Sequence, residues 1–217
     1  MNLKKRLTSA FFISFLFAIG FGLIALFISD KKIVNFDNRI SAYIQGLQSV
    51  GLTSVMKFFT FIGSGTVVAI IVIIVMILFY VVLKHRSELV LFIGVVIGSA
   101  LLNVVLKVVF HRARPTIKRL IEESGYSFPS GHSMAAFTLY GILTFLLWKH
   151  ISSSKGRSLF IIFSIMMTTL IGVSRIYLGV HYPSDVLGGF LASGTWLIFS
   201  IRSYQKYQDR NYRRKHS

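Results

Sequence analysis

The sequence predicts an all-α membrane protein with six transmembrane helices, on the evidence of its composition and its long apolar runs. Hydrophobic residues make up 54% of the 217 residues and charged residues only 14%, with a mean hydropathy of +0.69. Soluble domains carry about 25% charged residues. About 20 consecutive apolar residues are enough for a helix to cross a bilayer. We expect spans at residues 9–28, 66–83, 89–109, 134–148, 159–173 and 186–201, in one domain that covers residues 1–217.

The first span is expected to be a retained helix. Its apolar stretch is longer than that of a signal peptide, and the Ile28-Ser29-Asp30-Lys31 segment at its end lacks a small-x-small cleavage site. The fifth span, between Ser158 and Ser174, is short and contains threonines. The chain has no cysteine, so its residues say nothing about the redox compartment.

Residues 33–63, between the first two spans, form a predicted amphipathic helical segment. Apolar side chains recur there at helical spacing, opposite a polar face, at Ile33, Phe36, Ile40, Ile44 and Leu47. Gly51 divides the segment, and Gly63-Ser64-Gly65 ends it. Such a helix between two spans is expected to lie in the outer membrane interface. It would serve either as a simple surface connector or as a wall around the entrance to a site.

Basic residues are distributed unevenly between the two sides of the predicted bundle. Six spans put both termini on one side, where 14 of the 24 lysines and arginines fall, against 10 on the other side. The positive-inside rule therefore places both termini in the cytoplasm of a cell-membrane protein. The basic tail at residues 202–217 would then be a solvated end beside the anionic inner leaflet. No nucleic-acid-binding element accompanies the net charge of +17, so a nucleic-acid partner is not expected.

Three polar islands interrupt the apolar chain, each at the outer end of a predicted span. They are Lys107 with Arg114-Pro115, then Pro129-Ser130-Gly131-His132, and finally Ser174-Arg175 with His181 and Asp185. Charged groups are costly near hydrocarbon unless they have a partner or a task. Together the islands hold cations that can bind phosphate oxygens, two histidines and a carboxylate, which points to a phosphate-handling enzyme site on the outer side.

Each island also has an ordinary interpretation when it is taken alone. Basic residues at a helix end, such as Lys107 and Arg114 beside Pro115, are usually interfacial anchors. We expect headgroup contacts or a solvated loop for four further cationic positions, His111, Arg112, Lys118 and Arg119. Ser130 is a plausible N-cap, and Gly131 allows close backbone approach to an anion at the helix N-terminus, but a simple turn and cap has the same pattern.

The third island carries the strongest chemical signal. Pro183 suits the first turn of a helix, so Asp185 can reach back to one imidazole nitrogen of His181 and leave the other nitrogen free. That is how an oriented nucleophile or base is built. A structural hydrogen bond, or half of a metal site, would have the same spacing.

These three motifs resemble the signature of the type 2 phosphatidic acid phosphatases, a superfamily that includes acid phosphatases and vanadium haloperoxidases. The resemblance covers residues 107–185, and the chain is most similar to the bacterial phosphatidylglycerophosphatase B and undecaprenyl-diphosphate phosphatase group. It implies a lipid phosphate phosphatase whose nucleophile, His181, is oriented by Asp185 and forms a phosphohistidine, with His132 as acid and base. It implies phosphate binding by Lys107, Arg114, Ser130, Gly131, Ser174 and Arg175. Neither a metal nor another cofactor is expected, because three cations supply the electrostatic stabilisation.

Other functions use the same pattern. A soluble-substrate phosphatase or a haloperoxidase would share the site, but six spans favour a membrane lipid as the partner. A phosphotransferase would pass the phosphoryl group to an alcohol. A transporter or binding protein for an anionic lipid or phosphate would fit the six spans, although transporters usually bind near the midplane. Phosphatidylglycerophosphate, undecaprenyl diphosphate and phosphatidic acid all remain candidate substrates, and the oligomeric state is open.

Overall fold

The computed structural model describes residues 3–82, 84, 86–116 and 118–216, and the side chains of residues 11–81, 84, 86–116 and 118–214. Leu83, at the end of the second expected span, and Ser217, at the end of the tail, lie outside the described residues. The described residues form eight α-helices and one short π-helical turn. No β-strand occurs in this part of the chain, so the predicted all-α class is confirmed.

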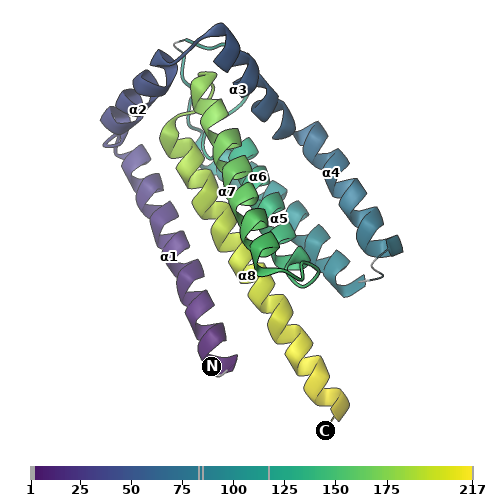
Figure 1. Cartoon of the computed structure of the whole chain (residues 1–217). Coiled ribbons are helices and arrows are strands. Elements are labelled where there is room, and N and C mark those ends of the chain that lie inside the picture. Colours follow the sequence, from purple (N-terminus) through teal and green to yellow (C-terminus); the bar gives the residue numbers. More distant parts are fainter. Residues whose placement is uncertain (1–2, 83, 85, 117, 217) are drawn as a thin grey trace.

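Figure 1 shows the helices coloured in chain order, with the first helix beside the last. They are α1 (Leu3–Ser29), α2 (Val34–Gly46), α3 (Val50–Ile62), α4 (Gly65–Ile77), the π-helical turn η1 (Leu78–Val82), α5 (Arg86–Phe110), α6 (Gly131–Leu147), α7 (Ser154–Tyr177) and α8 (Pro183–His216). α6 packs against α4, α5, α7 and α8, and α1 lies along α8. α2 and α3 cover the end of the bundle where α5 ends and α6 and α8 begin.

Four helices are long and apolar enough to cross a membrane by length and composition. These spans are Phe11–Ser29, Arg86–Phe110, Ser154–Tyr177 and Pro183–Arg214. α3 and the α4–η1 segment, which meet at an angle of 51°, would make a fifth if they form one broken span. α6 has 17 residues and is therefore about 26 Å long, somewhat less than the roughly 30 Å of a hydrocarbon core. The fifth expected span is longer than predicted, because Ser153 caps α7 six residues before Leu159.

The outward faces of the helices are apolar, as expected for a surface in contact with lipid. Large hydrophobic side chains such as Phe12, Ile73, Val104 and Ile162 are exposed on α1, α4, α5 and α7. The main buried cluster joins α4, η1, α5, α6 and α8 and contains Val75, Phe79, Leu91, Phe92, Val95, Leu139, Ile142, Leu146 and Leu197. The protein is thus a multi-pass helical membrane protein with a packed interior.

The α2 helix turns some of its polar side chains toward the protein, and apolar side chains at and after its C-terminal turn are exposed. Asp37 is 1% exposed, and the Gln45 side chain donates to the Ile176 carbonyl at 3.2 Å. Tyr43 and Leu47, by contrast, are 72% and 52% exposed. In this orientation the buried Asp37 carboxylate of α2 lies at the N-terminus of α8, where it accepts the Ser184 N–H.

The long loop between α5 and α6 is tied by its backbone to the turn between α7 and α8. Leu120 N–H donates to the Leu178 carbonyl at 3.0 Å, and Ser130 N–H donates to the Asp185 carbonyl at 3.0 Å. Gly179 has a φ of +76°, and a Cβ there would lie 2.5 Å from the Lys118 carbonyl oxygen, so this turn requires glycine. The three polar islands meet at this junction.

Candidate active site

His181 and Asp185 lie side by side at the start of α8. His181 Nδ1 is 3.3 Å from Asp185 Oδ2, and the same oxygen accepts the Tyr182 N–H at 2.9 Å. His181 is 2% exposed and Asp185 is fully buried. Burial lowers the pKa of His181 to about 4 against the opposing effect of Asp185. The imidazole is therefore uncharged at neutral pH, so one of its two ring nitrogens carries no proton and has a lone pair.

Arg114 contacts the other nitrogen of this imidazole. Its Nη1 lies 3.1 Å from His181 Nε2 and 3.0 Å from the Val180 carbonyl oxygen. Its Nε and Nη2 donate to the carbonyls of Ser124 and Gly125 at 3.0–3.2 Å. A guanidinium has donors only, so His181 Nε2 must be the acceptor, and Nδ1 then carries the proton that faces Asp185.

Arg175 approaches the same region from the end of α7. It is 1% exposed, and its Nη1 donates to Thr60 Oγ1 at 2.5 Å while Nη2 pairs with Glu123 Oε2. Its Nε is buried and has no hydrogen-bond partner among the described residues. A buried N–H without an acceptor is costly, and a phosphate oxygen would satisfy it.

Glu123 was missed by the sequence reasoning and lies between two of the predicted phosphate-binding arginines. Its Oε2 pairs with Arg175, and its Oε1 is 3.9 Å from Arg114 Nη2. Burial would raise the pKa of Glu123, but the charge and hydrogen bond of Arg175 outweigh that effect and lower it. The only hint in the sequence was an acidic pair, Glu122-Glu123, in the otherwise basic loop between α5 and α6.

Ser130 is the N-cap of α6, which confirms the predicted cap. Its Oγ accepts the Ser133 N–H at 3.4 Å and the Ser133 hydroxyl at 3.0 Å. A Cβ on Gly131 would lie 3.1 Å from Asn103 Oδ1, so glycine lets α6 begin close against α5. His132 follows on the same first turn, where a Cβ on Gly63 would lie 3.4 Å from its Cδ2.

The remaining two predicted phosphate-binding residues, Lys107 and Ser174, have different surroundings in the structure. Lys107 is half-buried on the last turn of α5, within electrostatic reach of Arg114, Glu123 and Arg175. The Ser174 hydroxyl, by contrast, donates to the Ile171 carbonyl of its own helix at 2.7 Å. Its single proton is thus directed away from the cations.

Arg112 corrects one sequence interpretation. A headgroup contact or a solvated loop was expected, but its side chain is only 13% exposed and forms ion pairs with Asp185 at 2.6 Å and with Asp37 at 2.7 Å. The expectation was wrong because the partner carboxylate Asp37 lies 75 residues away in the chain. Nothing local in the sequence indicates that pairing.

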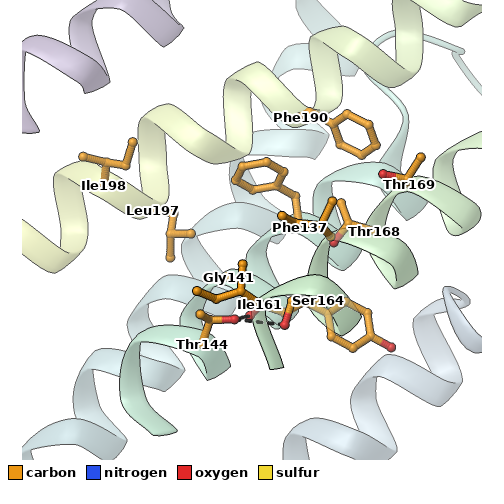
Figure 2. A pocket seen from close by; sticks show the side chains of 12 residues that line it. Phe137, Gly141, Thr144, Ile161, Ser164, Thr168, Thr169, Phe190, Leu197 and Ile198 are labelled. Carbon is orange, nitrogen blue, oxygen red and sulfur yellow. Dashed lines mark hydrogen bonds between the residues drawn. The ribbon is translucent and has the colours of Figure 1, made fainter. Parts of the chain in front are cut away.

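Two of the apolar cavities in the helical bundle lie against α6. Figure 2 shows one of about 360 Å³ between α6, α7 and α8, where the Thr144 and Ser164 hydroxyls bond to each other at 2.9 Å. The residues that line it include none of the motif residues. The second cavity, about 510 Å³, lies between α4, α5 and α6 and reaches Asn103 and Gly131. Of these two cavities, the second adjoins the site.

The site is a cluster of cationic side chains at one end of a helical membrane bundle, with the buried His181 at its centre. Within the described part of the chain, no three His, Asp or Glu side chains are grouped so that they could hold a metal ion. The fold and the site together define the class of a multi-pass helical membrane protein with buried arginines and a buried histidine gathered at one end of the bundle.

Comparison with known proteins identifies the family. Residues 88–209 match the model of the PAP2 superfamily. The chain is 33% identical over 189 residues to phosphatidylglycerophosphatase B of Bacillus subtilis (strain 168), covering 86% of this chain and 91% of that protein. It is 37% identical over 90 residues to an undecaprenyl-diphosphatase of Sulfolobus acidocaldarius, covering 42% of this chain and 39% of that protein.

Solved structures agree with this assignment. The crystal structure of a transmembrane PAP2 type phosphatidylglycerolphosphate phosphatase from Bacillus subtilis matches with a TM-score of 0.78 and 30% identity, over 91% of this chain and 96% of that chain. Aquifex aeolicus LpxE matches with a TM-score of 0.62 and 26% identity, over 76% of this chain and 94% of that chain. The chain belongs to the PAP2 superfamily, and it is a phosphatase, a hydrolase.

Proposed function

We propose that the protein hydrolyses the terminal phosphate of a membrane lipid through a phosphohistidine on His181. The observation that carries this proposal is the arrangement around the imidazole. Asp185 accepts from Nδ1, and Arg114 donates to Nε2. Nε2 therefore carries the lone pair, which becomes free to attack phosphorus when a phosphate oxygen replaces it as the acceptor of the Arg114 N–H.

The reaction proceeds in two steps. In the first, His181 Nε2 forms a bond to phosphorus while the bond to the leaving oxygen breaks, and His132 gives a proton to that oxygen. In the second, His132 takes a proton from water, which attacks phosphorus, and the P–N bond breaks to release inorganic phosphate. Asp185 stabilises the positive charge that His181 carries between the steps.

The electrostatic stabilisation comes from cations and free amides around the phosphoryl group. Lys107, Arg114 and Arg175 supply three positive charges, and the buried Nε of Arg175 supplies a donor that awaits an acceptor. The amides of Gly131 and His132, ahead of the capped Ser133 N–H, supply donors at the positive end of the α6 helix dipole. With these groups in place, we propose that turnover requires no metal ion.

The cavity of about 510 Å³ beside Gly131 supports a lipid substrate. Its walls are apolar side chains of α4, α5 and α6, so a hydrocarbon tail could lie in it while the phosphate reaches the cations. Phosphatidylglycerophosphate and undecaprenyl diphosphate are the first candidates, because relatives of this chain carry those names. Phosphatidic acid is the third.

We also propose a topology of six spans, with α6 and the α4–η1 segment as the two shorter ones. Both termini then lie in the cytoplasm, the site faces the exterior, and α2 and α3 lie in the outer interface. The exposed apolar side chains of α2 support the interfacial placement. Because the chain has no cysteine, single cysteines at Asp30 and Lys155 can be labelled with an impermeant maleimide. Labelling of the Lys155 position in intact cells would contradict this orientation.

The test of function is phosphate release by detergent-purified protein in the presence of EDTA, with each candidate lipid. Wild type and His150→Ala, a control histidine at the opposite end of the bundle, should release phosphate, and His181→Ala should not. The lipid from which phosphate is released fastest identifies the substrate class. Activity in His181→Ala would refute the nucleophile, and transfer to an added alcohol that exceeds hydrolysis would favour a phosphotransferase.

A further inference from the structure

We propose that Asp37 and Arg112 are positioning residues for the phosphoryl-transfer reaction. Arg112 holds Asp185 in place behind His181, and Asp37 balances the charge of Arg112 so that Asp185 can still stabilise a positive imidazole. This proposal rests on the proposed function, in which His181 is the nucleophile.

The geometry places Arg112 between two buried carboxylates. Its Nη1 lies 2.6 Å from Asp185 Oδ1, and its Nη2 lies 2.7 Å from Asp37 Oδ2. The other oxygen of Asp185 faces His181. A continuous line of contacts therefore runs from Asp37 on α2, through the loop after α5, to the imidazole at the start of α8.

Further contacts lock the guanidinium in one orientation. The Ser184 hydroxyl accepts from Arg112 Nη1 at 2.7 Å and donates to Asp37 Oδ2 at 2.6 Å, while Ser184 N–H donates to Asp37 Oδ1 at 2.9 Å. The Tyr182 ring lies 4.3 Å from the Arg112 Cζ. With its position determined on several sides, Arg112 fixes which Asp185 oxygen remains for His181.

The net charge of Asp37, Arg112 and Asp185 explains why a second carboxylate helps to stabilise a positively charged His181. Arg112 paired with Asp185 alone would form a neutral unit, which would weaken the stabilisation of a phosphorylated, positively charged His181. With Asp37 included, the three charges sum to −1. Asp37 and Asp185 are almost completely buried, so these interactions are screened less than they would be at the surface.

The first experiment uses Asp37→Asn, which removes the charge with little change of shape. We expect kcat on the preferred lipid to fall by about 10-fold to 100-fold, by analogy with the loss of the hydrogen-bond partners that orient metal-ligating histidines. KM and the affinity for inorganic vanadate, a phosphate analogue, should stay within about twofold because the phosphate-binding cations are untouched. The matched control is Asp30→Asn, which removes an exposed partner of Lys32 on the same connector and should leave kcat unchanged.

The second experiment tests whether Asp37 acts through Arg112. Lysine can hold one carboxylate but not both, so Arg112→Lys should retain more activity than Arg112→Met. The double variant Asp37→Asn/Arg112→Met should be no slower than Arg112→Met alone, because contacting residues of one network are not additive. A loss of kcat in the double variant equal to the product of the losses in the two single variants would overturn the proposal.

The outcomes separate this proposal from the proposed function. If wild type releases phosphate, His181→Ala does not, and Asp37→Asn keeps its full kcat, only the positioning role fails. If His181→Ala is active, the proposed function fails. Vanadate affinity that falls together with kcat in Asp37→Asn and Arg112→Lys would also overturn the proposal. So would loss of the folded state in both variants, measured by thermal unfolding in detergent, because the pair would then be structural.

Discussion

The Nη1 atom of Arg114 lies 3.1 Å from Nε2 of His181, and this contact determines where the imidazole carries its proton. Because arginine can only donate, Nε2 is the acceptor and Nδ1 carries the proton toward Asp185. The same guanidinium also anchors the loop after α5 through the carbonyls of Ser124 and Gly125. One side chain thus sets the tautomer of the proposed nucleophile and the position of the loop beside it.

Replacement of Arg114 by lysine should therefore reduce catalysis although the charge is kept. An ammonium cannot contact His181 and the loop carbonyls together, so we expect kcat/KM to fall by about 100-fold or more, as for loss of a transition-state donor. Steady-state phosphate release measures this. Arg119→Lys, at an exposed arginine of the same loop, is the control, and equal rates for the two variants would contradict the assignment.

The pH dependence should follow the lowered pKa of His181. Since the pKa is about 4 in the folded state against an ordinary value near 6.5, the unfolded chain binds a proton first as the pH falls. The contribution of the neutral buried imidazole is complete above about pH 6.5, and about 3 kcal/mol is lost on acidification toward pH 4. Thermal unfolding in detergent between pH 4 and pH 7 checks this.

His181→Gln removes the titrating group and provides the comparison for that measurement. The difference in stability between wild type and this variant should shrink or change sign as the pH falls from 6.5 to 4. A difference that stays constant over this range would show that His181 is not held neutral by burial.

Neutralisation of Glu123 should strengthen the binding of phosphate analogues. Its carboxylate pairs with Arg175 and lies near Arg114, so an incoming phosphate must compete with it. We expect Glu123→Gln to bind vanadate more tightly by about tenfold, equivalent to about 1.4 kcal/mol. Inhibition of phosphate release by vanadate gives the affinity.

Glu122→Gln is the matched control for this change, because Glu122 is the exposed neighbour in the same loop. It should leave vanadate affinity unchanged. Weaker vanadate binding in Glu123→Gln would mean that Glu123 holds Arg175 in position and does not compete with the anion.

The close approach of the α3–α4 turn to His132 can be tested by replacing Gly63 in this turn, and Gly51 as a control, with alanine. A Cβ on Gly63 would lie 2.5 Å from Ile171 Cγ2, so Gly63→Ala should destabilise the fold by about 1–3 kcal/mol. It should also slow turnover, because the turn must move from its place beside His132. Gly51→Ala, where the added methyl meets nothing within 4 Å, should do neither, and equal unfolding temperatures for the two variants would contradict the packing.

The sequence predicted those parts of the site that depend on neighbours in the chain. The N-cap at Ser130 was predictable because its hydroxyl bonds to an amide three residues later, and His181 and Asp185 are one helical turn apart. The partners of Arg112 and Arg175 could not be predicted. Asp37 lies 75 residues from Arg112 and Glu123 lies 52 residues from Arg175 in the chain. Helical periodicity relates only residues that are a few positions apart, so it cannot predict these pairs.

The length of the spans was also only partly predictable. Apolar runs identified the regions of α6 and α7, but the helix ends depend on caps and on the loops that hold them. Ser153 caps α7 ahead of its apolar run, and Ser130 caps α6, so that both helices begin before the apolar runs that predicted them.

By itself, the sequence determined the all-α membrane class and the three motifs, because hydrophobic runs and the chemistry of helix ends are local properties. Only the tertiary structure decided that Asp37 and Gln45 of α2 face the protein, that Arg112 joins Asp37 to Asp185, and that Glu123 lies among the arginines that we expect to bind phosphate. The physical reason is that a buried charge needs a partner, and which partner it meets depends on how the helices and loops pack in space.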